Sequence, residues 1–122
     1  MTLKGLEGVF SVCLLNGADS VNFESEYCFF GKTDDEYSLV CRCEDVPSDC
    51  VKREDGWRGF KISGTLDFSL VGILARISSI LAESGISIFA VSTYKTDYVF
   101  VKSECFDAAV GQLEKSGYKF EK

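Results

Sequence analysis

Histidine is absent from the chain, and its absence removes much of common enzyme chemistry. Ser-His-Asp and Cys-His schemes need an imidazole, which is also the group that most often exchanges protons near neutral pH. Acidic pairs occur at Asp34-Asp35 and Glu54-Asp55, but they lie in predicted loops with no clear basic or nucleophilic partner. The sequence also lacks a glycine-rich phosphate loop of Walker or Rossmann type. We therefore expect no enzymatic activity and no cofactor.

Six cysteines offer the remaining candidates for metal or redox chemistry. Cys41 and Cys43 share one face of a predicted strand, and together with Cys50 and either Cys28 or Cys13 they could form a Cys₄ site. Zinc sites favour two close cysteine pairs, whereas this chain has only one. Alternating positions on a strand are explained more simply by buried thiols, so a cysteine-based metal or redox site is the lesser alternative.

The overall composition narrows the class of partner. A net charge of −6 over 122 residues argues against nucleic acid, because phosphate binding needs clustered Lys and Arg. No uncharged apolar run reaches the roughly 18 residues of a membrane-spanning helix, so we expect no membrane partner. The first seven residues lack the apolar core of a secretory signal. We therefore expect a cytoplasmic protein with reduced thiols.

The first half of the chain is predicted to be mostly β. Three runs rich in β-branched and aromatic residues predict strands at 8–15, 26–32 and 37–43. The four polar residues between the last two runs predict a hairpin loop. A polar stretch, 44–55, is expected to connect two units and to hold at most a short helix near Pro47.

The second half predicts alternating strands and helices. Apolar residues recur at steps of three and four over 69–84, which indicates a helix with one buried face, and Gly85 follows as its stop. A second helix is expected from Ser103 to Gly117. Strands are predicted at 57–62, 86–94, 98–102 and 118–120, with a tight turn at 95–97. The order β-α-β-β-α-β predicts an α+β, ferredoxin-like unit with both helices on one face of the sheet.

The segments Asp67–Ile88 and Phe89–Lys102 resemble the ACT domain, a small-molecule regulatory module of amino-acid metabolism. The similar branch holds small stand-alone bacterial proteins with two ACT-like units and the ACT repeats of a cytosolic arginine sensor. The resemblance implies a ligand, typically an amino acid, bound at the first strand–helix loop and at an interface between ACT units. We interpret 57–122 as an ACT domain and 1–56 as a truncated, mostly β ACT-like sub-domain.

The strand–helix loop suits the carboxylate of such a ligand. A helix start presents unpaired N–H groups and the positive end of the helix dipole. Gly72, expected in the first turn, leaves room for a ligand or for tight packing. Asp67 could instead cap the helix, and Phe68 and Leu70 could instead be core. The predicted loop residues are Asp67, Phe68, Ser69, Leu70, Val71 and Gly72.

Asp97, at the end of the tight turn, is the leading candidate for the ligand's ammonium group, although turn aspartates often bond their own backbone. The resemblance to the arginine sensor adds Thr93, Tyr94 and Thr96 as ligand-binding candidates. Exposed edge strands favour pairing between ACT units, so a homodimer is expected. A regulator that binds a protein without a small ligand is the alternative function.

Overall fold

The computed structural model describes residues 1–63 and 71–121. The chain divides into two compact units. Unit 1 comprises Met1–Glu7 and Arg58–Lys122, and unit 2 comprises Gly8–Trp57. The predicted division after residue 56 is therefore corrected at the N-terminus, where the first seven residues belong with the C-terminal half.

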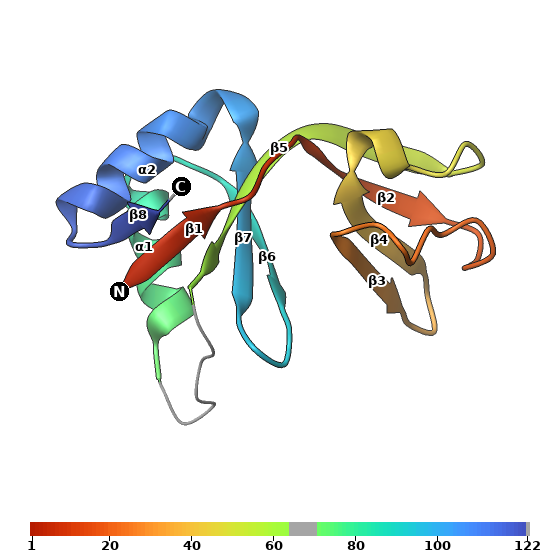
Figure 1. Cartoon of the computed structure of the whole chain (residues 1–122), viewed down its shortest axis with the longest axis horizontal. Helices are drawn as coiled ribbons and strands as arrows, with labels where there is room; N and C mark the ends of the chain where they lie inside the picture. Colours follow the sequence, from red (N-terminus) through yellow and green to blue (C-terminus); the bar gives the residue numbers. More distant parts are fainter. Residues whose placement is uncertain (64–70, 122) are drawn as a thin grey trace. The chain divides into compact units, whose positions relative to one another are not determined.

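Unit 1 combines strands and two helices in the predicted order (Figure 1). Its elements are β1 (Thr2–Gly5), the end of β5 (Lys52–Ile62), α1 (Ile73–Glu83), β6 (Ile88–Ser92), β7 (Asp97–Lys102), the 3₁₀ turn η2 (Ser103–Cys105), α2 (Phe106–Lys115) and β8 (Lys119–Glu121). In its sheet β6 pairs with β7, β7 with β5, β5 with β1, and β1 with β8. The series β5-α1-β6-β7-α2-β8 confirms the ferredoxin-like prediction.

Strand β1 is the element of unit 1 that the sequence did not predict. It lies between β5 and β8, with Leu3 opposite both Ile62 and Phe120. Leu3 is fully buried in the unit 1 core. The strand has four residues, too few to show an alternating pattern, so only its partners reveal it.

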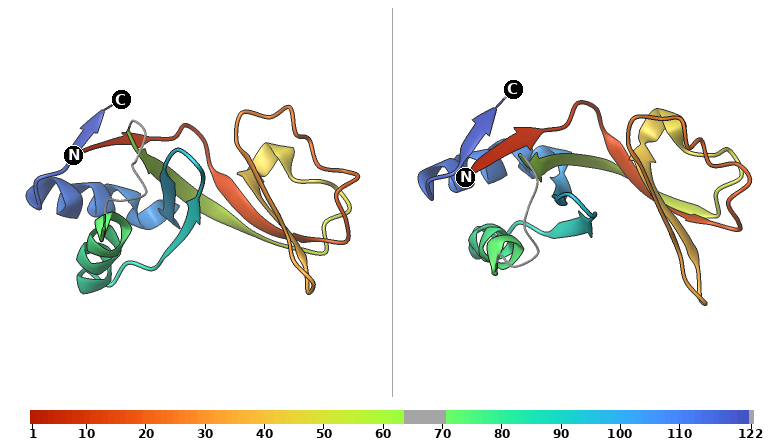
Figure 2. Two further views of the ribbon diagram at one scale, coloured as in Figure 1. Left: turned by 90° about the horizontal axis from the view of Figure 1, so that it is seen from below. Right: turned by 60° about the horizontal axis from the view of Figure 1, so that its bottom comes forward.

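Both helices cover the same face of the unit 1 sheet (Figure 2). Helix α1 buries Ile77 and Leu81, which confirms the predicted apolar face. The helix begins later than predicted, at Ile73. Gly72 precedes it with a φ of +79°, a left-handed conformation that a right-handed helix cannot include. Gly85, with a φ of +73°, ends it as expected.

The turn between β6 and β7 is displaced from its predicted position. The Thr93 N–H donates to the Thr96 carbonyl over 2.9 Å, so Tyr94 and Lys95 form the tip of the hairpin. Asp97 is consequently the first residue of β7, opposite Ser92, and not a turn residue.

Unit 2 is built from β2 (Phe10–Leu15), β3 (Cys28–Lys32), β4 (Tyr37–Arg42), the 3₁₀ turn η1 (Cys43–Asp45) and the start of β5. Its strands lie in the order β3-β4-β2-β5, all antiparallel. The predicted connection 44–55 is wrong in two respects: its short helix comes before Pro47, and β5 already begins at Lys52. The exposed side chains at the start of β5 are polar, so this part of the strand carries no apolar signal.

The hairpins β3–β4 and β6–β7 repeat each other sixty residues apart. Cys28 pairs with Cys41 where Ile88 pairs with Val101, and Lys32 pairs with Tyr37 where Ser92 pairs with Asp97. Each turn is closed by the same hydrogen bond, and each second strand leads into a 3₁₀ turn. The repeat supports the prediction that unit 2 is a shortened ACT-like unit. Where unit 1 has α1 and α2, unit 2 has the segments 16–27 and 46–51.

Candidate functional site

A pocket of about 320 Å³ opens in unit 1 where α1 begins and α2 ends. Val71, Gly72 and Ile73 form the α1 side, and Arg76 extends that side by one turn. Its lining is completed by Met1, Ser116, Gly117 and Tyr118. Two of the predicted loop residues, Val71 and Gly72, therefore lie in one concave site.

The N-terminus of α1 gives this pocket a preference for negative charge. Gly72 is the N-cap, and no described side chain caps the helix there. The first helical bond runs from the Arg76 N–H to the Gly72 carbonyl over 2.9 Å, so the preceding N–H groups have no partner within the helix. No acidic side chain lies in the first turn. A carboxylate in the pocket would accept from these N–H groups and meet the positive helix end.

Arg76 brings a positive charge to the same pocket, and the sequence did not single it out. Its Nη2 lies 3.5 Å from the Ser116 carbonyl oxygen, which links the start of α1 to the end of α2. The side chain is exposed and can therefore turn toward a ligand. The available signal was its position four residues after Gly72, one helical turn further along the same side.

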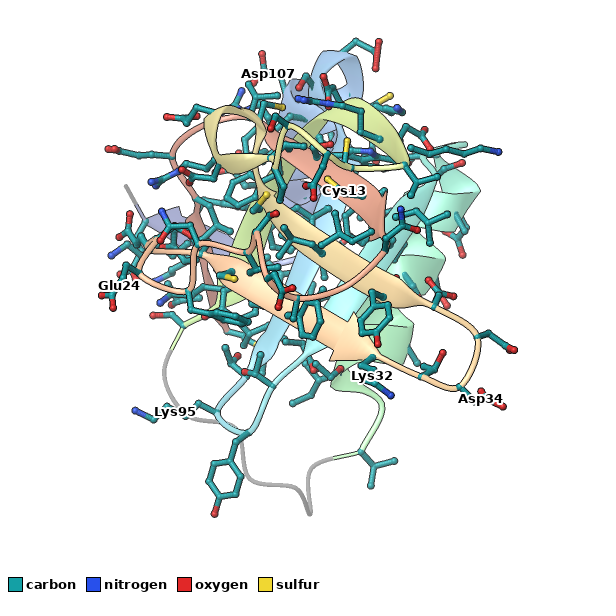
Figure 3. All side chains as sticks on the ribbon, turned by 90° about the vertical axis from the view of Figure 1, so that its right-hand side faces the viewer. Cys13, Glu24, Lys32, Asp34, Lys95 and Asp107 are labelled. Carbon is teal, nitrogen blue, oxygen red and sulfur yellow. The ribbon has the colours of Figure 1, made fainter. Side chains whose placement is uncertain are left out.

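The predicted hairpin residues lie elsewhere in unit 1, since Thr93, Tyr94, Thr96 and Asp97 do not line this pocket. The Thr93 hydroxyl donates to the Thr96 carbonyl over 2.9 Å. The Thr96 hydroxyl, only 6% exposed, donates to the Ile62 carbonyl over 2.8 Å. These two threonines thus hold the turn and anchor it to β5. Tyr94 is 81% exposed, and Figure 3 shows neighbouring Lys95 extending outward from the hairpin tip.

Four predicted loop residues lie outside the described residues: Asp67, Phe68, Ser69 and Leu70. Their ligand contacts stay predictions. Among the described residues, the structure accordingly brings together Val71, Gly72 and Arg76, and it places the predicted hairpin residues outside this pocket.

In the part of the chain that the structure describes, the cysteines are not arranged as the metal site that the sequence left open. All six lie within the described residues, and in those residues no three His, Cys, Asp or Glu side chains are arranged to hold a metal ion. Cys43 begins η1 and so does not continue the β4 face that carries Cys41. Burial raises the pKa of the Cys41 thiol to about 12 and also raises the pKa values of the Cys13 and Cys28 thiols. These groups are therefore neutral thiols at pH 7.

Neither described helix combines the length and apolar character that crossing a bilayer requires.

Comparison with known proteins identifies the family. Residues 52–115 match the ACT domain, and this stretch is more than half of the chain. The protein therefore belongs to the ACT domain family, as its residues predicted. No curated protein matches the chain.

Solved structures extend the similarity over both units. Protein Atu0741 from Agobacterium tumefaciens is 30% identical, with a TM-score of 0.87 over 98% of this chain and 91% of that one. The regulatory subunit of aspartate kinase from Thermus thermophilus shares the fold at 11% identity, with a TM-score of 0.63 over 94% and 96% of the two chains. Aspartate kinase from Clostridium acetobutylicum shares it at 18% identity and a TM-score of 0.64, over 91% of this chain and 33% of the kinase.

Proposed function

We propose that this protein is a non-enzymatic regulatory protein that binds an amino acid at the start of α1. Membership of the ACT domain family supports the class of function. The aspartate kinases that share its fold include a regulatory subunit and an enzyme described as allosteric. We extend their regulatory role to this chain as part of the proposal.

The observation that carries the proposal is the pocket between the start of α1 and the end of α2. Uncapped N–H groups after Gly72 and the guanidinium of Arg76 both favour the carboxylate of an amino acid. Val71, Ile73 and Tyr118 add apolar surface to the same lining. We therefore expect an amino acid with an uncharged side chain to bind better than a charged one.

The ammonium group of the ligand favours a carboxylate, and no Asp or Glu is among the described residues that line the pocket. Asp97 and Asp67 are the proposed acceptors. Because Asp97 does not line the pocket, we propose that it reaches the ligand across a contact between ACT units of two chains. Strand β6 pairs only with β7 among the described residues, and its other edge offers backbone groups for such a contact.

A thermal-shift screen of the twenty amino acids tests the proposal. A ligand at one hundred times its dissociation constant adds about 2.7 kcal/mol to the free energy of unfolding. Light scattering of the same samples tests for the homodimer. If no amino acid shifts the melting temperature, the binding proposal is wrong, and the regulator without a small ligand becomes the better one.

Arg76→Ala is the sharper test of the site. Loss of a charge-assisted hydrogen bond removes about 1.5–3 kcal/mol, so the dissociation constant should rise at least about tenfold. Lys52→Ala, which removes an exposed positive charge from the start of β5 in unit 2, should leave it unchanged. Equal weakening by both variants would mean that general charge, and not this pocket, attracts the ligand. Asp97→Ala should abolish binding while leaving the melting temperature of the free protein nearly unchanged.

A further inference from the structure

Cys28 and Cys41 face each other across the hairpin β3–β4 of unit 2. The turn fixes the hydrogen-bonding phase of this hairpin, because the Thr33 N–H donates to the Glu36 carbonyl over 2.9 Å. Hydrogen-bonded and non-hydrogen-bonded pairs alternate from there along an antiparallel ladder. Counting back through the register makes Cys28 and Cys41 a non-hydrogen-bonded pair.

This type of pair suits a disulfide. Directly opposite residues in it lie about 4.5 Å apart at Cα, with side chains on one face of the sheet. Disulfides span roughly 4.4–6.8 Å between Cα atoms. The two thiols therefore need only small adjustments to bond.

Both thiols lie on the face that forms the unit 2 core. Cys41 is 1% exposed and belongs to that core, and Cys28 packs against it while half-buried. The corresponding pair of the repeated hairpin is aliphatic, Ile88 and Val101, and it packs in the unit 1 core. The same two positions are thus occupied by thiols in unit 2 and by aliphatic side chains in unit 1, so packing alone does not require cysteine there.

The other thiols near this pair are less well placed. Cys13 lies on β2 opposite Leu39, whereas Cys41 lies opposite Ser11. Cys13 is therefore diagonal to Cys41, at about 7–8 Å, which exceeds the span of a disulfide. Its thiol donates to the Ser11 hydroxyl over 3.5 Å and also lies within hydrogen-bonding reach of the Cys41 thiol, so the backbone spacing, and not the distance between sulfurs, disfavours a Cys13–Cys41 bond. Figure 3 shows Cys13 within unit 2.

We propose that Cys28 and Cys41 form a redox-active dithiol that a small-molecule disulfide, such as oxidised glutathione, converts to a cross-strand disulfide. Cys28, the more accessible thiol, loses its proton and attacks one glutathione sulfur, which releases one molecule of reduced glutathione. Cys41 loses its proton and attacks the Cys28 sulfur of the mixed disulfide, which releases the second. The two glutathione thiolates that leave take up the two protons that the cysteines lose, so two protein thiols lose two electrons in all and one external disulfide is reduced to two thiols.

Oxidation would close the outer edge of the unit 2 sheet. Among the described residues, strand β3 pairs with β4 alone in that sheet, and an edge strand is where a sheet opens most readily. The disulfide would tie β3 to β4 and raise the melting temperature by roughly 5 °C or more. The Cys28–Cys41 pair would thus make the stability of this sheet edge depend on the ratio of oxidised to reduced glutathione.

The test treats the reduced full-length protein with oxidised glutathione and maps the products by mass spectrometry. Trypsin alone is insufficient, because its fragment 5–32 contains both Cys13 and Cys28. Added cleavage after glutamate separates them, and the proposal predicts a disulfide between fragments 27–32 and 37–42. The intact protein should lose the mass of two hydrogen atoms.

Matched variants assign the bond. Cys28→Ser should abolish it, whereas Cys13→Ser and Cys43→Ser should leave both the bond and the rise in melting temperature intact. A bond that joins Cys13 to Cys41, or glutathione that stays on Cys28 without release, would overturn the proposal. So would a wild-type protein whose thiols all stay free in excess oxidised glutathione.

Discussion

The two repeated hairpins of this protein have the same backbone arrangement, but different segments pack against them. In unit 1, β6–β7 packs under α1 and α2, and its inward pair is Ile88 and Val101. In unit 2, β3–β4 packs under irregular segments that contribute Val21, Val46 and Cys50, and its inward pair is Cys28 and Cys41. The comparison shows that an ACT-like hairpin keeps its register, turn and burial without the helices.

Under the proposed function, the helices instead determine where the ligand binds. The pocket of unit 1 exists because α1 begins beside the end of α2. Within its described residues, unit 2 has no α-helix and therefore no helix start that could receive a carboxylate. We infer that the repeat has divided its roles: unit 1 binds the ligand, and unit 2 carries the thiol pair.

The largest expected change in stability distinguishes the helices that pack on the unit 1 hairpin from the irregular segments that pack on the unit 2 hairpin. Leu81→Ala in α1 should lower the free energy of unfolding by about 2–5 kcal/mol, because Leu81 is fully buried under the helix layer. Val21→Ala in unit 2 should cost only about 1–2 kcal/mol. Urea denaturation measures both. A cost for Val21→Ala as large as that for Leu81→Ala would show that the irregular covering packs as tightly as the helices.

The strands of the two units should also respond differently to an added methyl group. A Cβ on Gly59 would lie 2.7 Å from the buried Phe100 ring, whereas a Cβ on Gly31 of β3 would meet nothing within 4 Å. Gly59→Ala should therefore destabilise the protein by about 1–3 kcal/mol. Gly31→Ala should be neutral or stabilise it by up to about 1 kcal/mol. Melting curves of the two variants check this, and similar losses for both would contradict it.

The buried thiols of unit 2 should have a smaller effect on the free energy of unfolding, and this effect should depend on pH. The pKa of Cys41 is about 12 in the folded protein and about 8.5 in an unfolded chain. The unfolded state therefore binds fewer protons between these values, and stability falls as pH rises, by at most about 1.4 kcal/mol per pH unit. Cys41→Val, which restores the residue type of Val101, should remove this part of the slope. Urea midpoints of wild type and variant at pH 8 and pH 10 measure it, and parallel slopes would contradict the account.

The sequence predicted the structure of unit 1 correctly where a hydrophobic pattern extended over many residues. The apolar period of α1 and the strand–turn–strand pattern around Tyr94 predicted the ferredoxin-like order, and the resemblance of residues 67–102 to the ACT domain predicted the family. Gly85 marked a helix end through the conformation that glycine permits. Local pattern and tertiary packing agree at these places, so either alone leads to the same structure.

Elements defined by their partners escaped prediction. Strand β1 is recognisable only between β5 and β8, and the polar start of β5 is a strand because β2 pairs with it. Arg76 was missed for the same reason, since its relevance comes from Ser116 at the end of α2. The helix start also lies later than predicted, because the apolar period does not reveal the left-handed conformation of Gly72.

A ¹⁵N NMR titration with the amino acid selected by the thermal-shift screen tests the central claim most directly. We predict saturable shifts of the amides from Gly72 to Arg76 and from Ser116 to Tyr118. The amides of the β3–β4 turn, from Thr33 to Glu36, should stay unchanged. Shifts confined to that turn, or shifts that never saturate, would contradict the assignment of ligand binding to the start of α1.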